Sequence, residues 1–156
     1  MLDVGTAAPD LSLQDSDGNA VRLADFTGTS AVLIYFMRTT SCPVCNRHVR
    51  EIAARSDELA AHGVTVLVAV PEGRAAAAAW KAKSKVPFTV VTGERGTPHA
   101  SVGLAKRVFG ALQQSGSILV DATGVVRHSH AATLPPMAYD KAGLAAALDG
   151  LRPISA

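Results

Sequence analysis

The sequence predicts an α/β fold, with a central mixed β-sheet flanked by helices. Residues 31–37 and 64–70 form two near-continuous apolar runs rich in branched side chains. Apolarity on both faces is typical of strands that are covered from both sides. Apolar residues at helical spacing lie between the two runs, so the three segments read as a βαβ unit. A hairpin and a last helix follow and complete a three-layer arrangement.

The chain is expected to begin with a β-hairpin over residues 10–24. Leu11-Ser12-Leu13 and Val21-Arg22-Leu23 both alternate apolar and polar side chains, as half-buried strands do. Between them, residues 15–19 are dense in turn-forming types, and Gly18 can adopt a positive φ. These features predict an N-terminal hairpin that extends the sheet.

The expected helices follow from capping signals. Pro43 suits the first turn of a helix, where its missing N–H has no partner to lose, and Gly63 would end that helix. An alanine-rich helix is expected over residues 72–83. A further helix would run from Thr97-Pro98 to about Phe109 and stop at Gly110.

The remaining elements close the fold. A short strand is expected at residues 87–91, and a second hairpin is expected at residues 117–128 around a turn at 121–124. The last helix would cover about residues 139–148. Without repeats or linkers, the chain is expected to form a single domain over residues 1–156.

Composition excludes several classes of function. With 48% hydrophobic residues the chain can bury a sizeable core, and its formal charge of +2 is too small to indicate nucleic acid or an anionic membrane as partner. No window reaches the roughly 20 apolar residues of a membrane span. The first residues lack the pattern of a signal peptide, so a cytoplasmic protein is expected.

The only two cysteines, Cys42 and Cys45, stand three positions apart at the expected strand-to-helix junction. In a reducing compartment such a pair is usually redox-active or metal-binding rather than a structural bridge. A zinc half-site completed by His48 and the His128/His130 pair stays open, as does an inert pair. Since zinc usually needs four ligands, redox chemistry is favoured, with no metal and no cofactor expected.

The position of Cys42 favours a reactive thiolate. If Pro43 is the first helical residue, Cys42 is the N-cap, and the helix dipole and free backbone N–H groups point at its sulfur. Such a position lowers a thiol pKa from its usual value near about 8.5, and Arg38 would add a positive charge. Cys45, one turn on, could then close a Cys42–Cys45 disulfide.

Several segments resemble a known family. A strand followed by Cys42-Pro43-Val44-Cys45, a helix and a strand resembles the thioredoxin fold. The opening residues 5–13, the stretch 21–26 and the segment 118–127 resemble peroxiredoxins of the alkyl hydroperoxide reductase/thiol-specific antioxidant type. The resemblance covers nearly the whole chain. It implies a thioredoxin fold and a thiol-dependent reduction of hydroperoxides.

The resemblance also bears on single residues. The peroxiredoxin pattern has Thr or Ser three residues before its cysteine, and Thr39 occupies this position. The resemblance implies that Thr39 orients the peroxide or the thiolate. Tyr35 occupies the position of the proline in this pattern. The pattern usually has an arginine before the strand of the second hairpin, and residues 115–117, which form that region here, contain none. Thioredoxins place a cis-proline there, yet no proline occurs between Pro98 and Pro135.

The candidate catalytic residues are therefore Cys42, Cys45, Thr39 and Arg38. The expected function is hydroperoxide reduction, with a thioredoxin-like protein disulfide reductase or a non-catalytic redox-sensing module as alternatives. The expected partners are a hydroperoxide or disulfide substrate and an external dithiol reductant such as a thioredoxin-like protein, with neither nucleic acid nor membrane. A homodimer is left open, because peroxiredoxin-like chains often dimerise.

Overall fold

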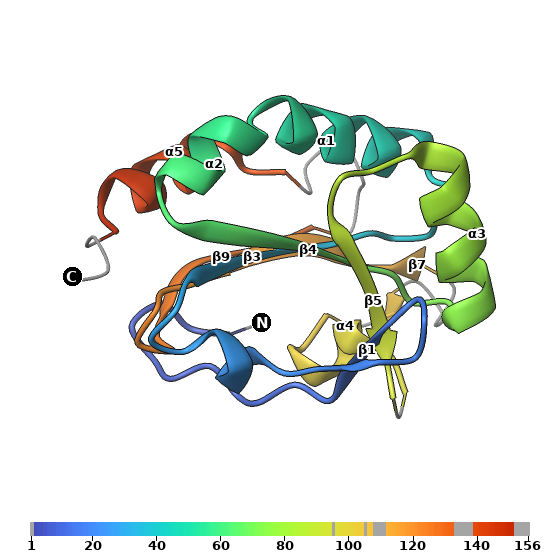
Figure 1. Ribbon diagram of the computed structural model, residues 1–156, viewed down its shortest axis with the longest axis horizontal. Coiled ribbons are helices and arrows are strands. Elements are labelled where there is room, and N and C mark those ends of the chain that lie inside the picture. The colour runs from blue at the N-terminus through green and yellow to red at the C-terminus, as the bar shows by residue number, and fades with distance from the viewer. Residues whose placement is uncertain (1, 95, 105, 108–111, 133–138, 152–156) are drawn as a thin grey trace.

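The computed structural model describes residues 2–94, 96–104, 106–107, 112–132 and 139–151 (Figure 1). Its strands are β1 Leu13–Asp15, β2 Ala20–Val21, β3 Ala31–Phe36, β4 Val64–Ala69, β5 Thr89–Gly93, β6 Lys106–Arg107, β7 Leu112–Gln113, β8 Ser115–Val120 and β9 Val126–Ala132. Its helices are the 3₁₀-helix η1 Leu23–Phe26 and the α-helices α1 Pro43–Ala54, α2 Ser56–Ala61, α3 Arg74–Ser84, α4 Pro98–Ser101 and α5 Lys141–Asp149.

The main sheet is mixed and runs in the order β2-β1-β5-β4-β3-β8-β9. One face is covered by α1, α2, α3 and α5, and the other by the N-terminal segment, η1 and α4 (Figure 1). The strands β6 and β7 pair with each other outside this sheet. The structure therefore confirms the expected three-layer α/β arrangement around a mixed sheet.

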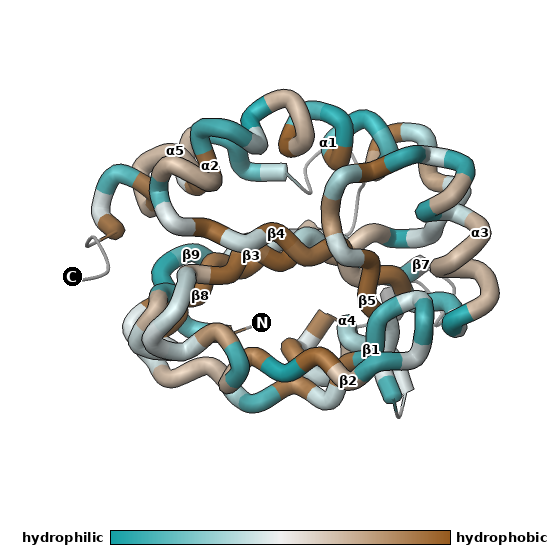
Figure 2. The backbone as a smooth tube through the Cα atoms, in the orientation of Figure 1, coloured by the Kyte–Doolittle hydropathy of each residue, from teal (hydrophilic) through white to brown (hydrophobic). Residues whose placement is uncertain are grey.

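Strand β3 is the centre of the sheet. It pairs in parallel with β4 and antiparallel with β8, and all six of its residues are buried. Because successive side chains of a strand point to opposite faces, Leu33 and Tyr35 pack under α1 while Ile34 and Phe36 pack on the other face. This double burial accounts for the continuous apolar run, which shows as brown in the central strands of Figure 2.

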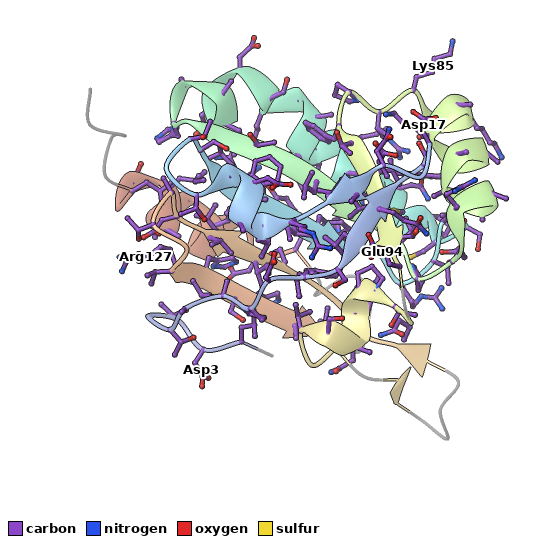
Figure 3. All side chains as sticks on the ribbon, turned by 60° about the horizontal axis from the view of Figure 1, so that its bottom comes forward. Asp3, Asp17, Lys85, Glu94 and Arg127 are labelled. Carbon is purple, nitrogen blue, oxygen red and sulfur yellow. The ribbon has the colours of Figure 1, made fainter. Side chains whose placement is uncertain are left out.

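The N-terminal hairpin is confirmed and extends the sheet at β5. Leu13 is opposite Val21 in β2 on one side and opposite Gly93 in β5 on the other. Gly18 has the positive φ that the turn requires. Asp17 is exposed in the turn of this hairpin, where it is labelled in Figure 3.

The helix expected to run from Pro43 toward Gly63 is two helices in the structure. Helix α1 ends at Ala54, and α2 begins at Ser56 after a break at Arg55. The Arg55 guanidinium donates to Glu58 at 2.9 and 3.0 Å, which fixes the new direction of the chain. The predicted end is confirmed, since Gly63 follows α2 with a positive φ of 71°.

The helix expected over residues 97–109 is wrong beyond its first turn. Helix α4 ends at Ser101, and Gly103 adopts a positive φ of 80°. The Leu104 N–H donates to the His99 carbonyl at 2.9 Å, a closure that ends a helix, and Leu104 itself is buried in the core. Residues 106–107 and 112–113 then form β6 and β7, while Phe109 and Gly110 lie outside the described residues.

The second hairpin is confirmed as β8 and β9, and its turn is stabilised by Asp121. The carboxylate accepts hydrogen bonds from the backbone N–H groups of Thr123 and Val125 and from the Arg127 guanidinium. Partial burial alone would raise the pKa of Asp121, but these bonds outweigh it and lower the pKa to about 2.

We expect Asp121→Asn to destabilise the fold at neutral pH by about 1 kcal/mol, a figure reduced for solvent screening. The stabilisation from a lowered carboxyl pKa is complete above its unfolded value near about 3.9 and is lost as the pH falls through about 2. Urea unfolding of both proteins at several pH values measures this difference. The exposed Asp17→Asn serves as control, and an Asp121→Asn penalty as large at pH 2 as at pH 7 would contradict the expectation.

Candidate active site

The two cysteines occupy the junction between β3 and α1, as expected. Cys42 is the N-cap of α1 in an extended conformation, and Pro43 is the first helical residue. The backbone N–H of Cys45 donates to the Cys42 sulfur over 3.3 Å. Both residues are free thiols, so the structure represents the reduced state of the pair.

The pair lies just beneath the surface. Cys42 is 2% exposed and Cys45 is fully buried, while the flanking Ser41 and Pro43 are both exposed. A groove of about 460 Å³ opens beside this turn between α1 and α3, lined in part by Ser41, Pro43 and Trp80. The Cys42 sulfur is therefore the nearer of the two to solvent. A small oxidant would displace less of the surrounding turn to reach this sulfur than a protein disulfide would.

The environment of Cys42 favours the thiolate. Burial alone would raise the pKa of its thiol, but hydrogen bonds from the Cys45 thiol and backbone N–H, together with the Arg38 guanidinium, lower the pKa below its ordinary value. Every favourable contribution comes from a group within the β3–α1 junction. The arrangement therefore supplies the attacking form of the thiol at lower pH than free cysteine does.

Cys45 has the opposite character. Burial and the hydrogen bond to Cys42 raise the pKa of its thiol to about 11. The backbone N–H of Arg38 donates to its sulfur at 3.4 Å and offsets part of this effect. The pair therefore combines a sulfur whose ionisation is favoured with a neighbouring thiol that stays protonated at neutral pH.

Arg38 contacts the cysteine pair, whereas the Thr39 hydroxyl is directed away from it. The Arg38 guanidinium interacts with the Cys42 sulfur, and its Nε is buried without a hydrogen-bond partner in the described part of the chain. The Thr39 hydroxyl lies 3.1 Å from the Ser41 hydroxyl. The structure thus brings three of the four candidates into contact and directs the hydroxyl of the fourth at a neighbouring loop residue.

The loop before Cys42 is anchored by residues that the sequence did not indicate. Thr40 donates to the Glu72 carboxylate through its backbone N–H at 2.9 Å and through its hydroxyl at 2.6 Å. The Asn46 side-chain amide donates to the Thr40 and Cys42 carbonyls, and the Trp80 indole N–H donates to the Asn46 oxygen at 2.8 Å. These contacts fix the approach to the reactive sulfur from α3 and the β4–α3 connection.

Tyr35 and His48 form a second group that the sequence did not indicate. The Tyr35 hydroxyl lies 2.8 Å from His48 Nδ1, and its interaction with the Cys45 sulfur lowers the pKa of the Cys45 thiol against the effect of burial. Burial raises the pKa of Tyr35 and lowers that of His48, so both are neutral at physiological pH. A tyrosine in place of the pattern's proline therefore brings a hydroxyl under the cysteine pair.

The geometry does not favour the zinc alternative. Within the ranges that the structure describes, no three His, Cys, Asp or Glu side chains are grouped as metal ligands are. His48 instead lies within hydrogen-bond distance of Tyr35, and His128 is a buried residue of β9.

In the part of the chain that the structure describes, no helix is both long and apolar enough to cross a bilayer.

Comparison with known proteins is consistent with this geometry. Peroxiredoxin Q of rice (Oryza sativa subsp. japonica), a chloroplastic protein, is 29% identical over 124 residues that cover 80% of this chain and 57% of the rice protein. Peroxiredoxin bcp1 of Schizosaccharomyces pombe is 26% identical over 141 residues, 90% of this chain and 72% of the yeast protein. The chain thus spans little more than half the length of the rice relative.

Solved structures share the fold. Peroxidoxin BcpB of Mycobacterium tuberculosis superposes with a TM-score of 0.80 at 17% identity, covering 98% of this chain and all of that one. Peroxiredoxin Q of Xanthomonas campestris gives 0.75 at 20% identity, with 96% of each chain covered. These likenesses confirm the expected thioredoxin fold. The family model described as AhpC/TSA matches residues 4–129, most of the chain, and the protein therefore belongs to the AhpC/TSA family.

Proposed function

We propose that this protein is a thiol peroxidase that reduces hydroperoxides through Cys42. The observation that carries the proposal is the state of that sulfur: its pKa is lowered at the N-terminus of α1, and it lies just below an exposed turn. Membership of the AhpC/TSA family and its similarity to proteins named peroxiredoxin support the same function.

The proposed cycle has three steps. The Cys42 thiolate attacks the outer peroxide oxygen, the O–O bond breaks, the alcohol or water leaves with a proton, and Cys42 becomes a sulfenic acid. The Cys45 thiol then attacks the Cys42 sulfur, which forms the Cys42–Cys45 disulfide and releases water. An external dithiol, such as a thioredoxin-like protein, reduces the disulfide by thiol–disulfide exchange. A reducing compartment such as the cytoplasm would sustain this last step.

Arg38 and Thr39 have separate proposed roles. The Arg38 guanidinium stabilises the Cys42 thiolate and would face the charge that develops on the peroxide oxygens. The Thr39 hydroxyl, now bonded to Ser41, would need to leave that partner to reach a bound peroxide. We therefore assign Arg38 the larger effect on the first step.

Stopped-flow mixing of the reduced protein with hydrogen peroxide, followed by mass spectrometry, tests the proposal. We expect a Cys42–Cys45 disulfide within one turnover, and a trappable sulfenic acid on Cys42 when Cys45 is replaced with serine. An oxidation rate no faster than that of free cysteine would overturn the proposal. Insulin reduction, measured in parallel, would then identify the disulfide reductase alternative, which the burial of both sulfurs argues against.

The ionisation of Cys42 predicts a pH profile for its alkylation by iodoacetamide. Because the thiolate forms as the pH rises through the pKa, Cys42 should react with a midpoint below that of free cysteine, and Cys45, whose pKa burial raises, should react only at higher pH than Cys42. Arg38→Met should move the Cys42 midpoint upward. Arg47→Met, which removes an exposed guanidinium one turn into α1, is the matched control. An unchanged midpoint in Arg38→Met would exclude the guanidinium as a source of the activation.

A further inference from the structure

Three buried polar groups form a continuous line beneath the reactive sulfur. The Tyr35 hydroxyl lies 2.8 Å from His48 Nδ1, and its interaction with the Cys45 sulfur lowers the pKa of that thiol against the effect of burial. Cys45 and Tyr35 are fully buried, whereas His48 is 5% exposed. The line therefore runs from the interior at Cys45 toward the surface at His48.

The fold holds these groups in place without reference to the peroxide. Tyr35 lies within β3, opposite Val68 of β4 and Ser117 of β8, so its backbone is fixed on both sides. Cys45 and His48 are three residues apart on α1 and therefore share one face of that helix. The line is present in the reduced protein, before any substrate binds.

Such a line addresses a difficulty in the second step of the cycle. Cys45 must lose its proton to attack Cys42, yet burial, the main cause that raises the pKa of its thiol in the reduced protein, still acts after Cys42 is oxidised. Burial therefore keeps most of the Cys45 thiol protonated at neutral pH, which limits the supply of its thiolate. A nearby proton acceptor would remove this limit.

We propose that Tyr35 and His48 are a proton relay that activates Cys45 when it attacks oxidised Cys42. This inference rests on the proposed function and concerns its second step. As the Cys45 sulfur bonds to the Cys42 sulfur, its proton passes to the Tyr35 oxygen, and the Tyr35 proton passes to His48 Nδ1. The S–O bond of the sulfenic acid breaks, and the departing hydroxide leaves as water once it takes a proton. The histidine then returns its extra proton to solvent, so the net change is one disulfide and one water.

The surroundings of His48 suit a neutral acceptor. Burial is the main cause that lowers the pKa of His48, so the ring is uncharged at neutral pH and its Nδ1 can accept. On its own helix Glu51 opposes this effect and Arg47 adds to it. From the facing elements, Tyr35 of β3 and the Tyr139 ring, at 5.5 Å between ring centres, are the titratable groups that contact it. Glu51 would stabilise the imidazolium that forms during the transfer.

The test separates the two steps of the cycle in Tyr35→Phe and His48→Gln. We expect peroxide oxidation of Cys42 to change by less than about 3-fold, whereas disulfide closure at pH 7 slows by about 10²-fold, a usual size for general base catalysis. The loss should shrink as the pH rises, because Cys45 then ionises unaided. A merely structural defect would slow closure equally at every pH. Tyr139→Phe removes a hydroxyl bonded to Arg55, outside the line, and is the matched control.

A second measurement reads the same step without peroxide. One equivalent of methyl methanethiosulfonate places a methylthio group on Cys42, and attack by Cys45 then releases methanethiol, which mass spectrometry follows as a loss from the protein. The same slowing in Tyr35→Phe and His48→Gln supports the relay even where wild-type protein fails to react with peroxide, a failure that would count against the proposed function alone. Closure at the wild-type rate at pH 7 in both variants would overturn the relay.

Discussion

Replacing Cys42 with serine is expected to abolish peroxide turnover, with a loss of at least about 10³-fold in kcat/KM. A serine hydroxyl at the N-terminus of α1 stays protonated at neutral pH, so the hydrogen bonds that activate the Cys42 thiolate have nothing to act on. Peroxide consumption with dithiothreitol as the dithiol, followed over many turnovers, measures the effect.

Cys45→Ser is the control for this experiment. It keeps the attacking sulfur, and we expect it to consume one equivalent of peroxide and then to stall as the Cys42 sulfenic acid unless the external thiol reduces that acid directly. Both variants should fold, because serine is only slightly smaller than cysteine and neither cysteine forms a disulfide in this structure. Sustained turnover by Cys42→Ser would move the chemistry away from this junction altogether.

The parts of the site that are contiguous in sequence could be predicted. Cys42, Pro43 and Cys45 carry their own geometry, because the start of a helix after a buried strand fixes the N-cap sulfur and the thiol one turn on. Arg38, four residues before Cys42, was found for the same reason. The continuous burial of β3 also follows directly from its apolar run.

The parts that depend on packing could not be predicted. Thr40 meets Glu72 only because the β4–α3 connection passes over the loop, and no local pattern distinguishes Glu72 from a solvated acid. Likewise, the pairing of Tyr35 with His48 depends on how α1 lies across β3. In both cases one partner belongs to an element whose orientation is decided by tertiary packing.

The errors in the helices have a similar cause. The start signal at Thr97-Pro98 and the stop signal at Gly110 suggested a helix that continues past Ser101. Gly103 instead adopts the positive φ that closes a helix, and the closure buries Leu104. At Arg55 the sequence shows no Gly or Pro, and the break is stabilised by an ion pair with Glu58 and a contact with Tyr139 from the far end of the chain. Gly103 could be recognised in the sequence as a possible helix end, whereas the contacts of Arg55 depend on the folded chain.

The departure from the peroxiredoxin pattern at position 35 has a physical explanation in the sheet. Tyr35 lies inside β3, which pairs with strands on both sides, and a proline there would remove a ladder hydrogen bond. The same position points its side chain at Cys45 rather than at solvent. The tyrosine thus keeps the hydrogen-bond ladder of the central strand and supplies the hydroxyl on which the proposed relay depends.

Gly116→Ala is expected to lower the free energy of unfolding by about 1–3 kcal/mol or more, the range for overpacking a buried position. Gly116 lies in β8 between Phe36 of β3 and Ala131 of β9, and an added Cβ would overlap the His130 backbone carbonyl. A side chain cannot rotate away from this clash, because the obstacle is the backbone of a paired strand. The β8–β9 ladder would have to separate locally.

This expectation also bears on the missing arginine of the peroxiredoxin pattern, since residue 116 has no room for any side chain between the two strands. Urea unfolding followed by circular dichroism measures the change, with Gly150→Ala as control. Gly150 caps α5 at a φ of −84°, and a Cβ there would meet its nearest neighbour at an ordinary 3.5 Å, so its midpoint should stay close to wild type. An unfolding midpoint of Gly116→Ala equal to that of Gly150→Ala would show that β9 can withdraw from β8 at little cost, and the rigidity assigned to this side of the active-site strand would be wrong.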